Sequence, residues 1–173
     1  WRINYPLADG SGQLTVATTH PETMLGDVAV MVNPEDERYS HLIGKHVMLP
    51  LCNREIPVIA DEYVDKEFGT GALKVTPAHD INDYNLGLKH NLEIVDTLND
   101  DGTLSAAAIV FVGEDRFTAR KKVIAALAAA GLLVKEQEYT TRLGYSQRNP
   151  DTVVEPRIST QWFVKMADMA KPA

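Results

Sequence analysis

The sequence predicts a mixed α/β (α+β) domain: a compact unit built around a curved β-sheet or small β-barrel with flanking helices. Three observations predict this fold class. Short strand-like segments separated by turns fill the first half, helical segments appear in the second half, and no regular βαβ alternation indicates a doubly wound sheet. The 173 residues, 45% hydrophobic and 24% charged, suffice for one domain with its own core, which we expect to span residues 1–173.

The strands expected in the first half are short and bounded by turn residues. Leu14 and Val16 alternate with polar or small neighbours, which is the two-residue period of a half-buried strand over residues 13–18. Residues 28–32 form a continuous apolar run typical of an internal strand, followed by a turn or short helix at 33–39. Further strands are expected at 46–49, 55–60 and 73–76.

The second half contains the expected helices. One covers residues 80–90, and the other covers residues 115–130 and ends at Gly131. The apolar positions of the first are Ile81, Tyr84 and Leu88, and those of the second are Phe117, Val123, Ile124 and Leu127. The second helix also carries a basic face of Arg120, Lys121 and Lys122. Short strands are expected at 94–97, 132–134 and 138–141, and a tight turn at 99–102.

Charge restricts the binding partners. Seventeen Lys and Arg against 24 Asp and Glu give 17 − 24 = −7, a balance that repels a polyanion at long range. A broad duplex-binding surface is therefore not expected. A local contact with one strand end remains compatible, because clustered cations act within a Debye length of about 8 to 10 Å.

Cysteine content and segment composition exclude other classes. The single cysteine, Cys52, can form neither an intrachain disulfide nor a thiolate zinc site by itself. No apolar run reaches the roughly 18 residues of a membrane-spanning helix, so we expect no membrane contact. The sequence opens on Trp1 without a charged and apolar leader, which we interpret as a piece of a longer protein.

Polar side chains concentrate first at residues 18–23, where a strand passes into a turn. Threonine hydroxyls, an imidazole and a carboxylate could converge there on a ligand carbonyl or ribose. On spacing alone, the favoured interpretation is a helix start, with Thr19 as N-cap, Pro21 in the first turn and Glu22 completing a capping box. The two interpretations are compatible, because a helix N-terminus offers free N–H groups to a ligand.

A second polar concentration covers residues 69–84. If 73–76 is a strand, Lys74 and Thr76 share one face, and the following turn places His79 at the strand's end. Asp80 and Asp83 lie three residues apart, on one side of the next helix's first turn. They suit the anchoring of a ligand ammonium group, but N-capping by Asp80 and dipole compensation by Asp83 explain the spacing equally well.

A third concentration is basic, and a solvated helix face is its favoured interpretation, with a phosphate-contacting patch as the alternative. It consists of Arg116, Arg120, Lys121, Lys122, Arg142, Arg148 and Arg157. No metal site is expected, because His20, His79 and His90 do not share a helix face at i, i+4 spacing. No Gly-x-Ser-x-Gly nucleophile elbow is present.

At these motifs the chain resembles the editing domain, called connective polypeptide 1, of the valyl-tRNA synthetases. The similarity rests on five ordered motifs that cover nearly the whole chain: residues 18–27, 33–39, 56–61, 69–84 and 155–166. Isoleucyl and leucyl enzymes share residues 18–23, here named the Thr-rich peptide, and the aspartate at Asp83. The amino-acid sequences of residues 74–80 and 161–163 favour the valyl member of the family.

The resemblance implies the curved-sheet fold of these editing domains and hydrolysis of threonine esterified to tRNA(Val), together with the misactivated threonyl adenylate. The implied partner is the aminoacylated 3′ end of tRNA(Val), in a cytoplasmic, monomeric protein. Editing needs no cofactor, whereas ATP and Mg belong to the catalytic core of the parent, a valine–tRNA ligase. Residues 1–6 and about 155–173 would be the junctions to that core, whose signature motifs are absent here.

The resemblance also assigns site residues. Asp83 would hold the substrate α-ammonium, Asp80 and Thr76 would contact the threonine side chain or the attacking water, and Lys74 would face the terminal adenosine or developing negative charge. The remaining substrate-binding positions are Thr18, Thr19, His20, Glu22, Thr23 and His79.

One departure from the family pattern concerns His20, where relatives commonly have Arg. A permanent cation is replaced by an imidazole, whose charge depends on pH, so we expect weaker and more pH-dependent substrate capture. Two alternatives stay open: a noncatalytic module that binds a tRNA 3′ end or small ligand, and an editing domain of an isoleucyl or leucyl synthetase.

Overall fold

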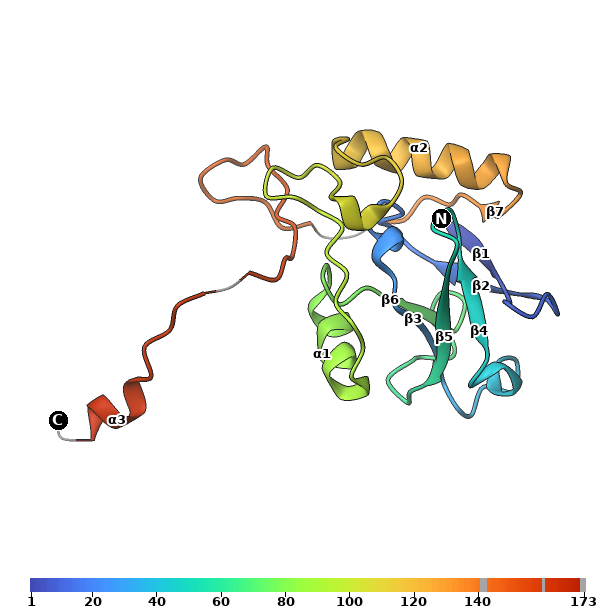
Figure 1. Cartoon of the computed structure of the whole chain (residues 1–173), viewed down its shortest axis with the longest axis horizontal. Coiled ribbons are helices and arrows are strands. Elements are labelled where there is room, and N and C mark those ends of the chain that lie inside the picture. Colours follow the sequence, from blue (N-terminus) through green and yellow to red (C-terminus); the bar gives the residue numbers. More distant parts are fainter. Residues whose placement is uncertain (141–142, 160, 172–173) are drawn as a thin grey trace.

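Two β-sheets form the body of the chain, whose computed structural model describes residues 1–140, 143–159 and 161–171 (Figure 1). The first sheet is antiparallel, in the order β2-β1-β7, with β1 at Arg2–Pro6, β2 at Gln13–Ala17 and β7 at Leu133–Lys135. The second has the order β4-β5-β3-β6, with β3 at Ala29–Val32, β4 at His46–Leu49, β5 at Arg54–Ala60 and β6 at Ala72–Val75. Strands β3 and β5 are parallel, and the other pairs are antiparallel.

Helices cover these sheets. In Figure 1, α2 (Arg116–Ala129) lies along the three-stranded sheet, while α1 (Ile81–His90) lies beside the four-stranded one. Short 3-10 turns occur at η1 (Thr23–Gly26), η2 (Ser40–Leu42) and η3 (Ala106–Ala108). The C-terminal segment extends away from the body and ends in α3 (Met166–Ala170). Within the described ranges, no helix is both long and apolar enough to cross a membrane.

The main core lies between the two sheets and beneath α2. It includes Ile3 and Leu14 from the first sheet, Val30 from the second and Leu127 from α2, all fully buried. An isolated bridge between Leu7 and Val47 joins the sheets at one edge. The expected mixed α/β class is confirmed, with both sheets contributing to one core, whereas the curved sheet or small barrel stays a prediction.

Strand β3 has both faces covered, which explains its uninterrupted apolar sequence. Val30 and Val32 face the main core, whereas Ala29 and Met31 belong to a second cluster that includes Leu86 of α1. The predicted internal strand at 28–32 is therefore confirmed, and it connects the main core to the helix that carries Asp83.

The predicted strands at 13–18, 46–49, 55–60, 73–76 and 132–134 are confirmed within a residue or two. The strand predicted at 94–97 is wrong: Gly26 packs so closely against this segment that an added Cβ would lie 2.7 Å from the Val95 carbonyl oxygen. Thr97 instead bonds Ser105 and His79. Residues 138–140 are also not a strand, and residue 141 lies outside the described residues. Sequence patterns missed β1 altogether.

The predicted helices are confirmed, but their buried faces differ from expectation. Ile81 and Leu88 of α1 are about two-thirds exposed, and the helix buries Leu86 and Gly87 instead. Gly87 permits this packing, because an added Cβ would lie 3.0 Å from Pro77. In α2, Val123 and Leu127 are buried as predicted.

Two leucine truncations test this assignment of helix faces. Leu127→Ala should lower the free energy of unfolding by about 2 to 5 kcal/mol, because Leu127 is fully buried in the main core. Leu88→Ala should cost less than about 1 kcal/mol, because that side chain is 63% exposed. Urea unfolding of both variants measures the difference, and equal losses would refute the assignment.

Candidate functional site

The structure brings nearly all predicted site residues to one cavity of about 610 Å³. It is bounded by the end of β2, the turn before η1, strand β6 and the first turn of α1. The predicted residues that line it are Thr18, Thr19, His20, Thr23, Lys74, Thr76, His79, Asp80 and Asp83. Glu22 does not line this cavity. Its side chain is buried behind the Thr-rich peptide.

The sequence did not predict a buried carboxylate, Asp27, that hydrogen-bonds residues of this site. Asp27 Oδ2 accepts a 2.6 Å hydrogen bond from the Tyr5 hydroxyl, and Asp27 Oδ1 accepts one of 2.6 Å from Thr76 Oγ1. Lys74 Nζ lies 3.5 Å from Asp27 Oδ1 and donates to Thr76 Oγ1 over 2.6 Å. The prediction that Lys74 and Thr76 share one strand face is confirmed.

The charges of this network are coupled. Burial alone disfavours the charge of Lys74, but the carboxylates of Asp27 and Asp83 outweigh it and raise the Lys74 pKa. Burial also raises the pKa of Asp27, while Lys74, Thr76 and Tyr5 all favour its charged form. Because each of these neighbours donates a hydrogen bond or carries positive charge, we treat Asp27 as ionised and Lys74 as charged at neutral pH.

The hydrogen bonds of the Thr76 hydroxyl determine whether it can donate to a ligand or accept from one. Its hydroxyl proton goes to Asp27 and one of its lone pairs accepts from Lys74. Only the acceptor capacity of the remaining lone pair is left for a ligand. The hydroxyl can therefore accept a hydrogen bond from a ligand O–H or ammonium, but it cannot donate one.

Asp83 is held in place by the backbone of the same strand end. Its Oδ2 accepts a 2.8 Å hydrogen bond from the Thr76 N–H, and the residue is only 6% exposed. Burial raises the pKa of Asp83 to about 6, although Lys74 and the Thr76 N–H favour the charged form. Asp83 is thus a carboxyl group whose pKa lies close to neutral pH. No arginine or lysine of the described structure lies within ion-pair distance of it.

Asp80 is the N-cap of α1, as one of the two interpretations predicted. Its Oδ1 accepts from the backbone N–H groups of Asn82 and Asp83, at 2.7 and 3.1 Å. No hydrogen bond in the described structure uses its other carboxylate oxygen, and the residue is exposed at the cavity wall. Capping and ligand binding are therefore compatible for this side chain.

His79 is fixed in one neutral form. Its Nε2 accepts a hydrogen bond from the Thr97 N–H over 3.1 Å, which places the ring proton on Nδ1. Burial lowers the pKa of His79 to about 4, so the ring is neutral at physiological pH. Nδ1 is buried without a hydrogen-bond partner among the described residues.

The capping box predicted at Thr19 and Glu22 is wrong. The turn η1 begins later, and its N-cap is Glu22, which makes no side-chain capping bond. Thr18 Oγ1 instead accepts from the His20 N–H, and Thr23 Oγ1 donates to the His20 carbonyl. The peptide is a hydrogen-bonded turn at the cavity wall.

Glu22 forms a long-range ion pair that explains its burial. Arg120 of α2 reaches it with two hydrogen bonds of 2.7 and 2.5 Å, and His20 Nδ1 lies 3.3 Å from it. Although burial opposes its charge, the bonds from Arg120 and His20 hold the pKa of Glu22 below its usual value. This pair fastens α2 to the Thr-rich peptide.

The basic concentration of the second half is largely paired with carboxylates, and Lys121 and Lys122 are exposed on α2, as the solvated-face interpretation predicts. Besides Arg120, the paired members are Arg116 with Glu155, Lys122 with Glu114, and Arg157 with Asp96 and Asp100. Lys121 and Arg148 make no ion pair among the described residues, and Arg142 lies outside them.

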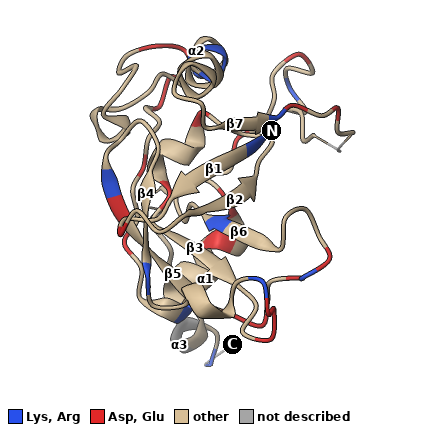
Figure 2. Cartoon of the chain, turned by 90° about the vertical axis from the view of Figure 1, so that its right-hand side faces the viewer, with Lys and Arg blue, Asp and Glu red and all other residues tan. Residues whose placement is uncertain are grey.

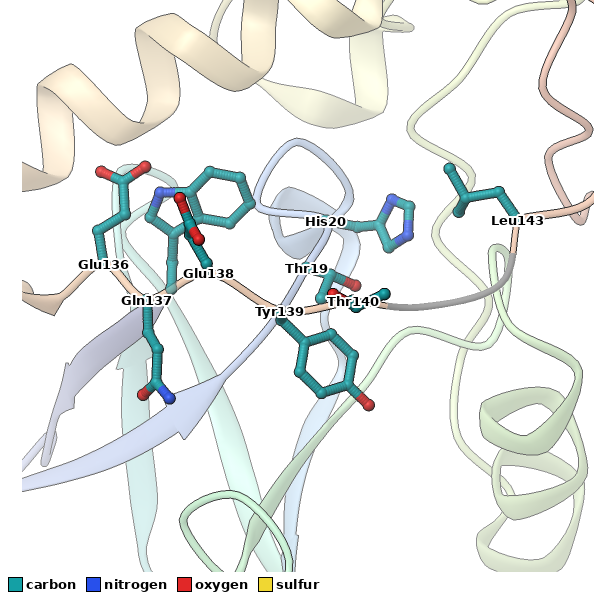
Figure 3. Close-up of a pocket in the computed structure, with 9 residues that line it drawn as sticks. Thr19, His20, Glu136, Gln137, Glu138, Tyr139, Thr140 and Leu143 are labelled. Carbon is teal, nitrogen blue, oxygen red and sulfur yellow. The ribbon is translucent and has the colours of Figure 1, made fainter.

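A second cavity of about 500 Å³ adjoins the first and shares Thr19 and His20 with it. Figure 3 shows the extended chain at 136–140 passing in front of the Thr-rich peptide, with Glu136 and Glu138 on one side and Gln137 and Tyr139 on the other. This segment forms a wall common to both cavities.

The arrangement suits recognition of a ligand that carries both an ammonium group and polar atoms. Figure 2 shows basic and acidic residues next to each other at β6, within a sheet that is otherwise mostly uncharged. Carboxylates at Asp80 and Asp83 can bind a cation, while Lys74 and the hydroxyls of Thr18 and Thr19 can bind oxygen atoms.

Comparisons with known proteins match this chain to aminoacyl-tRNA synthetases. The sequence profile of a family described as "Leucyl-tRNA synthetase, editing domain" matches residues 35–141. A valine–tRNA ligase of Carboxydothermus hydrogenoformans is 64% identical over 171 residues, which are 99% of this chain and 19% of that protein. The valine–tRNA ligase of Bacillus subtilis is 56% identical over 173 residues, 100% of this chain and 20% of that protein. The chain thus spans about a fifth of these relatives' length.

A structural comparison agrees on the fold. A crystal structure of the ternary complex of the Agrobacterium radiobacter K84 agnB2 LeuRS with tRNA and LeuAMS superimposes with a TM-score of 0.56. The match covers 75% of this chain and 18% of that chain at 21% identity. Similarity at this level establishes the shared fold.

The raised pKa of Asp83 predicts a pH-dependent stability difference. The folded-state pKa of about 6 lies above the ordinary value for an aspartate, so this group contributes its full stabilisation at low pH and loses that contribution as pH rises through 6. Asp83→Asn should therefore be more stable, relative to the unchanged chain, at pH 7.5 than at pH 4, by about 2 to 3 kcal/mol. Urea unfolding at both pH values measures this, and a pH-independent difference would contradict it.

Proposed function

The chain belongs to the aminoacyl-tRNA synthetase editing-domain family, in the form found in valine–tRNA ligases, and on this premise we propose that it hydrolyses threonine wrongly esterified to tRNA(Val). Hydrolysis of an aminoacyl-tRNA ester is what the family implies in general. The observation that carries the specific proposal is the cavity where a buried carboxylate, Asp83, lies beside the acceptor-only hydroxyl of Thr76.

Physical chemistry explains why such a cavity is required. Threonine and valine have nearly the same shape, and a hydrophobic pocket rejects the added hydroxyl by only about 10²-fold, for which valyl-tRNA synthetase is itself the standard example. A second site must therefore bind the hydroxyl with groups that valine would leave unpaired. The free lone pair of Thr76 and the free oxygen of Asp80 are acceptors of this kind.

The substrate ammonium is assigned to Asp83. An aminoacyl ester carries a free α-ammonium at neutral pH, and a carboxylate with little solvent exposure binds it more strongly than an exposed one does. Lys74 is retained by Asp27 on the other side of Thr76, so it does not neutralise Asp83 by direct pairing. Substrate binding should weaken below about pH 6, where Asp83 is protonated.

The hydrolytic step needs only a positioned water, because the ester is already activated. Lys74 and the hydroxyls of Thr18 and Thr19 would stabilise negative charge that develops on the carbonyl oxygen. The remaining assignments, Thr23, His20 and His79 around the last ribose, follow from their places on the cavity wall. Glu22 acts through the Arg120 pair that holds the Thr-rich peptide, rather than by contact with substrate.

The proposal extends to the longer parent protein. We propose that the parent joins valine to tRNA(Val) with ATP and Mg in a separate catalytic core and acts as a cytoplasmic monomer. Threonyl adenylate is then a second substrate of the same cavity, since it offers the same ammonium and side chain to Asp83 and Thr76.

A deacylation assay tests the proposal. The chain should accelerate loss of threonine from Thr-tRNA(Val), with little effect on Val-tRNA(Val), and Asp83→Asn should lower kcat/KM by about 10²-fold through loss of the ammonium contact. Glu62→Gln, which changes an exposed carboxylate outside both cavities, serves as the matched control and should keep full activity.

Three outcomes would change the assignment. Binding of Thr-tRNA(Val) without faster ester loss would favour a noncatalytic module. Faster hydrolysis of Val-tRNA(Ile) than of Thr-tRNA(Val) would favour an isoleucyl-type editing domain. Near-native activity of Asp83→Asn would remove the assigned role of that residue.

A further inference from the structure

Two basic side chains lie opposite each other across neighbouring strands at the rim of the larger cavity. Arg2 of β1 is the register partner of Lys135 of β7 and, on its other side, of Ala17 of β2. All three residues line the cavity, and both cations are exposed. Figure 2 shows Lys and Arg positions in blue near the N-terminus, where β1 and β7 run side by side.

A β-bulge creates this pairing. Ile3 pairs with Leu133, so a regular antiparallel ladder would place Val134 opposite Arg2. The register shifts between Arg2 and Ile3, and Lys135 takes that place instead. The irregularity therefore brings a second positive charge next to the first.

This arrangement costs stability, and no ion pair among the described residues offsets that cost. Like charges directly opposite across strands are destabilising. Neither Arg2 nor Lys135 makes an ion pair with a described residue, whereas most other described Lys and Arg side chains do. In a chain with net charge −7, an uncompensated cation pair at a cavity rim indicates an anionic ligand.

The position of the pair suggests which anion. Asp80 and Asp83, partly offset by Lys74, supply negative charge to the lining of this cavity, whereas Arg2 and Lys135 supply positive charge at exposed positions of the same lining. A ligand with an ammonium at one end and an anion at the other would match both groups of charges. An aminoacyl ester of a nucleotide has this distribution, because a phosphate is attached on the 5′ side of the nucleoside that carries the ester.

We propose that Arg2 and Lys135 form a phosphate-binding pair that contacts the phosphate on the 5′ side of the ester-bearing nucleoside. The inference rests on the proposed function and adds a subsite to it. Glu138, which lines the same cavity, limits the net attraction and so favours a single phosphate over a longer polyanion.

Three threonyl esters distinguish the sources of the contact: threonyl-adenosine, the same ester bearing a 5′-phosphate, and Thr-tRNA(Val). In the unchanged chain the 5′-phosphate should lower KM. Arg2→Gln and Lys135→Gln should each raise KM for the two phosphate-containing substrates about two- to fivefold, leave kcat unchanged, and leave threonyl-adenosine unaffected. Each should also reduce the slope of log(kcat/KM) against log[salt] for Thr-tRNA(Val) by about 0.7.

Two controls are a variant that conserves the charge at residue 2 and a variant that removes a cation elsewhere on the surface. Arg2→Lys should retain most of the phosphate effect. Lys121→Gln, which removes an exposed cation outside both cavities, should change nothing. Equal losses on all three esters, or no loss on any, would overturn the phosphate contact while leaving the proposed function intact. Failure of the unchanged chain to hydrolyse any of the esters would overturn the proposed function, and this inference with it.

Discussion

The buried carboxylate of Asp27 is the interaction on which the cavity depends. Removing a carboxylate from water is costly unless donors surround it, and Asp27 has Tyr5, Thr76 and Lys74 as neighbours. These contacts join β1 to the end of η1 and to β6. They also determine what the cavity offers: the Lys74 charge is held to one side, and the Thr76 hydroxyl is left able only to accept.

Because Lys74 is paired with Asp27, the second carboxylate, Asp83, has no direct cationic partner among the described residues. It is buried and bonded to one backbone N–H, which places its pKa near 6 instead of far below neutrality. Asp83 is thus a buried carboxylate that can still form an ion pair, which suits the binding of a ligand ammonium group. The net charge of −7 fits this arrangement, since a domain that binds the end of a nucleic acid needs a few placed cations rather than a basic surface.

Local features of this architecture could be predicted from the sequence, and long-range ones could not. The two-residue period placed Lys74 and Thr76 on one face, and the Asp-x-x-Asp spacing placed Asp80 at the helix start. The Arg120–Glu22 pair joins residues 98 apart, and the Thr76–Asp27 bond joins residues 49 apart. No periodicity encodes such pairs, so the sequence predicted neither the partner of Arg120 nor the role of Asp27. The strand expected at 94–97 failed because its polar groups bond His79 and Ser105 instead of a sheet edge.

The central claim is that ionised Asp83 receives the substrate ammonium, and proton release on binding tests it most directly. Titration calorimetry with a nonhydrolysable threonyl-amide analogue of the adenosine end, at pH 6 in two buffers of different ionisation enthalpy, counts the protons exchanged. A pKa of about 6 in the free protein predicts release of about half a proton per ligand bound, because the ammonium favours the charged carboxylate. Asp83→Asn should abolish that release. No release from the unchanged chain, or the same release from Asp83→Asn, would contradict the account.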